Sequence, residues 1–178
     1  MKIALTYPLA ALLISCSPAL YGQQQPPNPA ATQREAMQKV AFLTGHWSGP
    51  VTVVRGPGEP LHLTQTEDIA FKLDGLVLLI EGASRDSNGK SLFSALATVS
   101  FDDATGTYRI RAYNDGHYLD TELSLLPKGF SWGFSAGPAR IANVMHLTDK
   151  GEWAETADAT VGNNPPHRSV DMLLQHQP

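Results

Sequence analysis

The chain of 178 residues has a single cysteine, Cys16, and this scarcity excludes several kinds of site. One cysteine cannot form an internal disulfide, so an exported form of the protein must derive its stability from core packing. A zinc site built on several cysteines is also excluded. A Cys/His catalytic pair is excluded as well, because Cys16 lies at the end of an N-terminal apolar run where it would be either lipidated or removed with a signal peptide. Stability and function must therefore rest on other residue types.

Basic residues are also few, with 13 Lys and Arg against 17 Asp and Glu and a net charge of −4. They form no cluster in the sequence, whereas a surface that binds phosphates needs a basic face. We therefore do not expect nucleic acid as a partner. The chain also lacks a Gly-x-Ser-x-Gly motif, a glycine-rich phosphate loop and histidine pairs at metal-ligand spacing. The sequence thus predicts no catalytic motif, no cofactor and no metal.

Only one long hydrophobic run occurs, IALTYPLAALLI over residues 3–14. Twelve residues are too few to span a bilayer and are typical of a signal-peptide core, so we expect a signal peptide over residues 1–22. LISC at residues 13–16 resembles a bacterial lipobox, which would lipidate Cys16 and tether the protein to a membrane. Alternatively, an ordinary peptidase cleaves after Gly22. The protein is then expected in the periplasm, as an outer-membrane lipoprotein or as a secreted protein.

Two further segments precede the predicted sheet. Residues 23–31 are rich in Pro, Gln and Ala, which is typical of a disordered tether. From Thr32 the run TQREAMQKVAFL has apolar residues near a spacing of three to four, and Thr32 with Glu35 resembles a capping box. We expect a short amphipathic helix that ends at Gly45, and a folded domain over residues 32–178.

After Gly45 the apolar residues alternate with period two, which is typical of strands. Ten runs are separated by short turns that contain Gly, Asn or Asp. The predicted strands are His46–Arg55, Leu61–Leu73, Leu76–Ser84, Ser91–Phe101, Thr107–Asn114, His117–Leu126, Phe130–Ala136, Arg140–Thr148, Glu152–Ala159 and Arg168–His176. This pattern predicts an all-β fold, a ten-stranded antiparallel up-and-down barrel in which the last strand pairs with the first.

Four short motifs occur in order along this pattern. They read LTGHWSG at 43–49, LDGLVLLIEG at 73–82, FDDATGTYR at 101–109 and TDKGEWAET at 148–156. With the preceding helix, they resemble the calycins, meaning the lipocalins and fatty-acid-binding proteins. The resemblance is closer to the bacterial exported lipocalin-like domains of unknown function of the DUF1579 kind, and it covers residues 35 to 176. It implies the same calycin-like β-barrel.

The resemblance also implies a structural role for Gly45 and Trp47. In calycins this tryptophan plugs one end of the barrel, beside the short helix and a basic residue of the last strand. Here the basic residue is expected near Arg168 or His176. Glycine at position 45 would let the chain turn from helix to strand, and the indole would cover apolar surface. We interpret Trp47 as a plug and not as a ligand contact.

A ten-stranded barrel is wide enough to leave a cavity for one small ligand. Arg111 and Tyr113 lie on one face of their strand and could bind a carboxylate if that face points inward, as fatty-acid-binding proteins use such residues. The alternative is that this face is the outer, solvated one. Trp132 and Phe134 share a face that must be buried, either as core or, together with Phe93, as a cavity wall.

The sequence therefore predicts an exported domain that binds a small, largely apolar ligand inside the barrel without catalysis. Three alternatives stay open. One is a ligand-free interaction module of the cell envelope, whose barrel would be filled. Another is an isomerase- or hydrolase-like enzyme with an inward Glu or His of raised pKa. The pairs Glu67 with Asp68 and Glu152 with Glu155 are adjacent or on opposite faces, so sequence spacing alone makes neither an acid–base pair. The last is a heme-binding barrel, for which His146 is the candidate ligand.

Overall fold

The computed structural model of the chain describes residues 28–178. The predicted signal peptide, the lipobox, Cys16 and most of the predicted tether lie outside the described residues. The ten strands are β1 Gly45–Val53, β2 Leu61–Lys72, β3 Val77–Arg85, β4 Ser91–Asp102, β5 Thr107–Asn114, β6 His117–Leu126, β7 Gly129–Ala136, β8 Ala139–Leu147, β9 Trp153–Val161 and β10 His167–Gln177. Every predicted strand is confirmed, with ends that differ by at most two residues.

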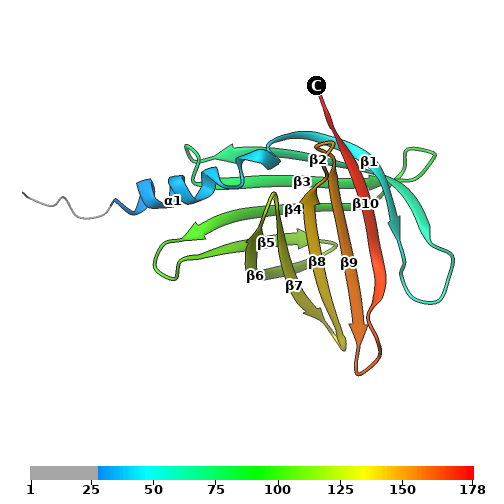
Figure 1. Cartoon of the computed structure of the whole chain (residues 1–178). Coiled ribbons are helices and arrows are strands. Elements are labelled where there is room, and N and C mark those ends of the chain that lie inside the picture. The colour runs from blue at the N-terminus through cyan, green and yellow to red at the C-terminus, as the bar shows by residue number, and fades with distance from the viewer. Residues whose placement is uncertain (1–27) are drawn as a thin grey trace, which may run out of the picture.

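The strands form a closed barrel in which each one pairs with its neighbours in sequence (Figure 1). The first and last strands close it, because β1 pairs antiparallel with β10 from His46–Gln177 to Val53–Val170. This confirms the predicted pairing and the ten-stranded antiparallel barrel. Closure removes the free sheet edges that would otherwise promote aggregation.

The helix begins earlier than the sequence pattern predicts. Helix α1 spans Pro29–Gln38 and is followed by a 3₁₀ turn, η1, over Ala41–Leu43. The N-cap is Asn28, whose side chain accepts a hydrogen bond from the Ala30 amide at 3.1 Å, and Pro29 follows it. Asn is a strong N-cap and Pro is favoured at the first helical position, so these residues start the helix before Thr32. The expected capping box at Thr32, and a tether that extends to residue 31, are therefore wrong.

Helix α1 lies beside one end of the barrel, near the β2–β3 and β4–β5 turns (Figure 1). The Tyr108 hydroxyl of β5 donates to the Ala36 carbonyl at 2.7 Å, and Arg34 forms an ion pair with Asp74 at 2.8 Å. The side chains of Met37, near the end of the helix, and Val40, just after it, are fully buried in the core. The helix is thereby fastened to two hairpins and helps to close this end.

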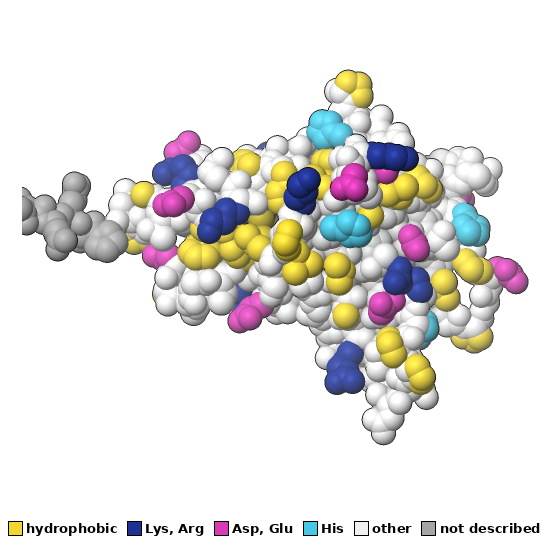
Figure 2. Space-filling view, in the orientation of Figure 1, with side chains coloured by type: hydrophobic (Ala, Val, Ile, Leu, Met, Phe, Trp, Pro, Cys, Tyr) yellow, Lys and Arg dark blue, Asp and Glu magenta, His cyan; other side chains and the backbone are white. Residues whose placement is uncertain are grey.

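Alternation along the strands separates an inner from an outer face. On β5, Tyr108 and Ile110 are buried, whereas Tyr113 on the opposite face is 52% exposed. On the face in Figure 2, basic and acidic side chains are interspersed over the outer surface. Within residues 28–178, no helix is both long and apolar enough to span a membrane.

Candidate functional site

One end of the barrel is closed by an aromatic cluster centred on Trp47. The Trp47 side chain is 3% exposed, and its indole N–H donates to the Leu43 carbonyl at 2.8 Å. Its ring packs edge-on against Trp153 and His176, with centroid distances of 5.8 and 4.8 Å. Trp47 is thus buried beside the 3₁₀ turn, as the predicted plug requires, and the imidazole of β10 takes the place expected for a basic residue.

Gly45 makes this packing possible. Its φ of +124° is a conformation that residues with side chains rarely adopt, and a Cβ there would lie 2.2 Å from Nε2 of His176. The glycine therefore serves both the turn into β1 and the close approach of His176. Arg168, the other candidate for the basic residue, lies further along β10 and pairs with Asp158 at 2.7 Å.

Above this closed end lies a large cavity of about 1440 Å³. Its walls come from all ten strands, and it reaches the opposite end, where Arg55, Gly56, His117, Gly137 and His167 surround the mouth. The volume exceeds the range of about 300–1,000 Å³ that is common for ligand pockets. The barrel is therefore hollow, and a filled barrel is not what the structure shows.

The upper walls of the cavity are apolar. Trp132 and Phe134 of β7 point inward and stack on each other, with ring centroids 5.6 Å apart and planes inclined by 14°. Phe93 of β4 also lines the cavity and is covered on one side by the Arg55 guanidinium, 6.0 Å from the ring centroid. The structure thus places all three predicted aromatic side chains in the wall. Their contact with a ligand stays a prediction.

Polar side chains gather in the wall on two sides of the cavity. On β2 and β3, Ser84 donates to Oε1 of Gln65, and Gln65 Nε2 donates to Oε1 of Glu67 at 2.6 Å. Gly82 faces Glu67 across this strand pair, and a Cβ there would lie 2.7 Å from Oε2 of Glu67. The glycine therefore makes room for the carboxyl group against the wall.

On β8 and β9, Glu155 and Asn143 line the same cavity. Glu155 Oε2 accepts a hydrogen bond from the Trp153 indole N–H at 2.9 Å. Asn143 is 7% exposed, and its Nδ2 is a buried side-chain polar atom for which the described residues provide no partner. A buried amide donor without an acceptor is costly, so this side chain favours a ligand or water oxygen beside it.

Burial changes the ionisation of both carboxyl groups. It raises the pKa of Glu67 from 4.5 to about 7, opposed by the hydrogen bond from Gln65 and increased by the negative charge of Glu155. Burial also raises the pKa of Glu155 from 4.5 to about 7, opposed by the hydrogen bond from Trp153. At neutral pH each group can therefore hold or release a proton, which surface glutamates do not do.

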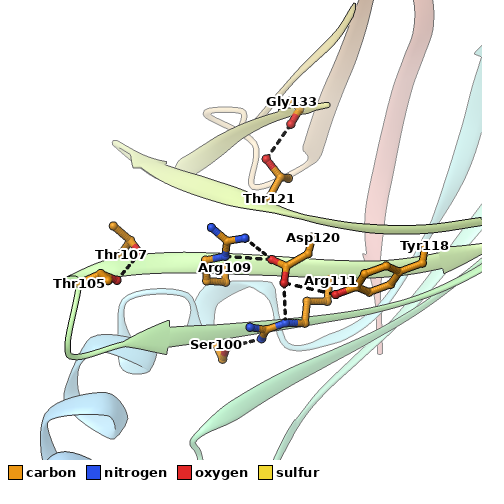
Figure 3. A network of polar contacts seen from close by, with 9 residues as sticks. All are labelled: Ser100, Thr105, Thr107, Arg109, Arg111, Tyr118, Asp120, Thr121 and Gly133. Carbon is orange, nitrogen blue, oxygen red and sulfur yellow. Dashed lines mark hydrogen bonds and ion pairs between the residues drawn. The ribbon is translucent and has the colours of Figure 1, made fainter. Parts of the chain in front are cut away.

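The structure corrects the expectation that Arg111 and Tyr113 point into the barrel. Both lie on the outer face of β5, because the inner face of that strand carries Tyr108, Ile110 and Ala112. Arg111 Nε donates to Asp120 of β6 at 3.1 Å (Figure 3). Tyr113 packs against Tyr118 with ring centroids 5.2 Å apart. The alternative of an outer, solvated face is the correct one.

Asp120 is the centre of this outer network. Arg109 donates to it through Nε at 2.9 Å and also through Nη2, and the Tyr118 hydroxyl donates to Oδ2 at 3.3 Å (Figure 3). The hydrogen bond from Arg109 is the main cause that lowers the pKa of Asp120. Arg109 and Arg111 thus have an acidic partner, Asp120, on the surface. Their charges are balanced there without a bound ligand.

His146 is also on the outer face. It is exposed on β8, between the buried residue Met145 and Leu147, and it does not line the cavity. A heme inside the barrel could not be ligated by this side chain, so the heme-binding alternative loses its candidate residue. Among residues 28–178, no group of three or more His, Cys, Asp or Glu side chains is arranged to hold a metal ion.

The cavity wall is interrupted between β6 and β7. These strands pair only over four residue pairs, from Leu123–Trp132 to Leu126–Gly129. Beyond them the contact is a side-chain hydrogen bond, in which Thr121 Oγ1 donates to the Gly133 carbonyl at 2.8 Å (Figure 3). Asp120, although on the outer face, contributes to the cavity lining there. We call this interruption, between residues 117–122 and 133–136, the β6–β7 seam.

The acidic residues of the cavity were not selected by sequence reasoning. Glu67 lies next to Asp68, and Glu155 lies close to Glu152, and sequence spacing alone gives neither pair the geometry of a catalytic acid and base. The available signal is alternation, since Glu67 shares its face of β2 with the apolar residues Leu63, four positions before it, and Ile69, two positions after it. An acidic residue on the apolar face of a strand therefore indicates a carboxyl group inside the barrel.

Comparison with known proteins supports the fold. No family model matches the chain, and no curated protein matches it either. Among solved structures, the chain is similar to Rv2717c from M. tuberculosis, with 14% sequence identity and a TM-score of 0.63. The match covers 80% of this chain and 98% of that one. The lipocalin-like, DUF1579-like membership stays a prediction, and the shared property is the antiparallel β-barrel.

Proposed function

We propose that the barrel encloses a small, largely apolar molecule and that its function is binding without catalysis. The observation that carries this proposal is the cavity of about 1440 Å³, closed at the Trp47 end and lined by aromatic and aliphatic side chains. Burial of an apolar ligand would supply affinity at about 25 cal/mol for each Å² of apolar surface removed from water. Trp132, Phe134 and Phe93 would form the apolar contact surface.

Native mass spectrometry of the purified protein, followed by a thermal-shift panel of fatty acids, retinoids, alkylamines and heme, tests this proposal. We expect a retained small molecule, or a shift with at least one apolar member. A bare mass and no shift across the panel would support the interaction-module alternative instead.

A matched pair of variants links any binding to the cavity. Ala112 lies inside the barrel on β5, whereas Ala142 lies outside on β8 and is exposed. Ala112→Phe fills part of the cavity and should weaken binding at least about tenfold, while Ala142→Phe adds the same group outside and should leave it unchanged. Equal effects of both variants would contradict binding in the cavity.

A barrel enzyme is the second candidate, favoured by the inward carboxyl groups of Glu67 and Glu155 with pKa values of about 7. Enzymatic action would return the ligand in altered form. We would therefore incubate each ligand that binds with the protein and recover it for mass and chromatographic analysis. A product whose formation is lost in Glu67→Gln would favour the enzyme, and unchanged ligand would favour the binder.

We also propose that the protein is exported and is tethered through a lipidated Cys16. The support comes from the sequence, in the apolar run 3–14 and the lipobox-like residues 13–16. Metabolic labelling of expressing bacteria with an alkyne fatty acid should mark the wild-type protein but not Cys16→Ser. A wild-type protein that is exported but unlabelled would indicate the alternative, cleavage after Gly22.

A further inference from the structure

The charged residues of the cavity are unequally distributed along its length. The deep wall carries Glu67 and Glu155, whereas Arg55, His117 and His167 lie at strand ends around the mouth. Within residues 28–178, no Lys or Arg side chain lines the deep part of the cavity. A bound molecule would therefore meet acidic and amide groups at the closed end, and a basic group only at the entrance.

Each deep carboxyl group has spare hydrogen-bonding capacity. Glu67 receives one bond from Gln65 through Oε1, and Glu155 receives one from Trp153 through Oε2. An ionised carboxylate has two oxygens and accepts up to about four hydrogen bonds. Among the described residues the second oxygen of each group has no hydrogen-bond partner, so two acceptors are available to a ligand, one on β2 and one on β9, which is three strands away around the barrel.

The two groups also act on each other. Burial is the main cause of the raised pKa of Glu67, and the negative charge of Glu155 raises it further, so two ionised carboxylates in this cavity disfavour each other. A positive group between them would relieve both the repulsion and the cost of holding a carboxylate away from water. Charge-assisted hydrogen bonds from N–H donors to carboxylates are about twice as strong as neutral ones.

On these grounds we propose that the cavity selects amphipathic amines, whose ammonium group lies between Glu67 and Glu155 while the apolar part lies against the aromatic wall. The proposal rests on the binding function above and names its ligand class. Asn143, with its unpartnered amide donor on the neighbouring strand, would bind an oxygen near the amine, such as the hydroxyl of an amino alcohol.

The same arrangement opposes fatty acids. A carboxylate placed at the closed end would face two carboxyl groups with no cation to balance them. A fatty acid could place its carboxylate only at the mouth, near Arg55. Because Arg111 and Tyr113 lie on the outer face of β5, they do not provide the inward carboxylate site that the sequence predicts.

Three probes with the same alkyl chain test the proposal: dodecylamine, dodecanol and dodecanoate, used below their aggregation limits at pH 7.5. Binding can be followed by isothermal titration and by tryptophan fluorescence, since Trp132 and Trp153 line the cavity. We expect the amine to bind at least about tenfold more tightly than dodecanoate, because only the amine forms charge-assisted bonds with the deep carboxylates.

The double variant Glu67→Gln/Glu155→Gln keeps the shape of both side chains and removes their charge. It should weaken dodecylamine at least about tenfold while dodecanol changes by less than about twofold, which also shows that the variant is folded. Glu122→Gln on the exposed face of β6 is the matched control and should change neither probe.

The outcomes separate the two proposals. Dodecanoate binding as tightly as the amine, or amine binding unchanged in the double variant, would overturn the amine preference while leaving the cavity a binding site. If none of the three probes binds, the amine preference falls, and the binding function then depends on the wider panel that includes retinoids and heme.

Discussion

At the scale of single residues, Glu67 and Glu155 lower the free energy of unfolding when they are ionised, because burial in the cavity disfavours their charged form. An ionised carboxylate is unfavourable away from water, so the folded protein holds protons on these groups that the unfolded chain releases. Their pKa values of about 7 against 4.5 define the range in which this matters. Between about pH 4.5 and 7 the folded state binds more protons, and the contribution of these groups to stability falls as pH rises.

The first prediction concerns Glu67→Gln and Glu155→Gln, which mimic the protonated form. Near pH 4.5 each variant should have the stability of the wild type. At pH 8 each should be more stable, by about 1 to 3 kcal/mol, because the wild type then carries a buried negative charge. Urea unfolding at both pH values measures the difference. Glu122→Gln should show no such dependence, and a variant that loses stability at pH 8 would contradict the prediction.

Gly45 is the second residue with a prediction at this scale, because the absence of a side chain at this position lets His176 approach closely. Gly45→Ala introduces both an unfavourable φ of +124° and a Cβ that would lie 2.2 Å from Nε2 of His176. We expect a loss of about 1 to 3 kcal/mol in unfolding free energy. Adding His176→Ala removes the steric part only, so the pair should cost less than the sum of the two single variants. Simple additivity would show that the contact with His176 is unimportant.

At the scale of elements, the sequence was sufficient to predict where the strands lie. It was insufficient to predict which face of each strand points into the barrel. Turns such as the Asp-Gly at 115–116 define where β5 ends and β6 begins, and all ten strands were predictable from such signals and alternation. Which face points inward was ambiguous on β5, because Tyr108, Ile110 and Ala112 alternate with Arg109, Arg111 and Tyr113, and both faces carry large side chains. The partner that decides it, Asp120, lies on the next strand.

The two deep carboxyl groups, Glu67 and Glu155, were not predicted, for a related reason. Glu67 and Glu155 come from strands that are far apart in the sequence, and only closure of the barrel brings them to one cavity. Trp47 was predictable because its environment is local: the carbonyl it binds is Leu43, four residues earlier. The helix start was missed because Asn28 and Pro29 lie in a stretch whose composition resembles a linker.

The β6–β7 seam gives the prediction that belongs to this scale. Thr121→Val removes the hydrogen bond to the Gly133 carbonyl but keeps the shape of the side chain. We expect a loss of about 1 kcal/mol and faster amide exchange in residues 117–122 and 133–136 than in β8 and β9. Thr98→Val, on the outer face of β4 where both neighbouring strands pair with it, is the control. Unchanged exchange at the seam would show that this bond does not hold the strands together.

At the scale of the whole molecule, closure of the barrel fixes the orientation of a ligand. The Trp47 end is sealed by aromatic packing and covered by helix α1, whereas the opposite end and the β6–β7 seam adjoin the cavity. A molecule that enters from either opening reaches the deep carboxyl groups only with its leading end. An amphipathic amine would therefore bind with its head group inward and its tail toward the mouth.

The last prediction follows from the ionisation of the deep carboxyl groups. At pH 7 Glu67 and Glu155 are partly protonated, since their pKa values are about 7. An ammonium group between them favours the ionised form and lowers both pKa values, so amine binding should release up to about one proton near pH 7. Isothermal titration of dodecylamine in buffers of different ionisation enthalpy measures this number directly.

The direction of this proton release and the pH range in which it occurs follow from the two glutamates alone. An alkylammonium has a pKa near that of lysine, about 10.4, so it stays charged throughout and contributes no proton. Amine affinity should therefore rise with pH from about 6 to 8 and then level off, because the carboxyl groups ionise over that range. Dodecanol should show neither proton release nor this rise, and Glu67→Gln/Glu155→Gln should abolish both for the amine. Proton uptake on amine binding would contradict a head group placed between these two carboxylates.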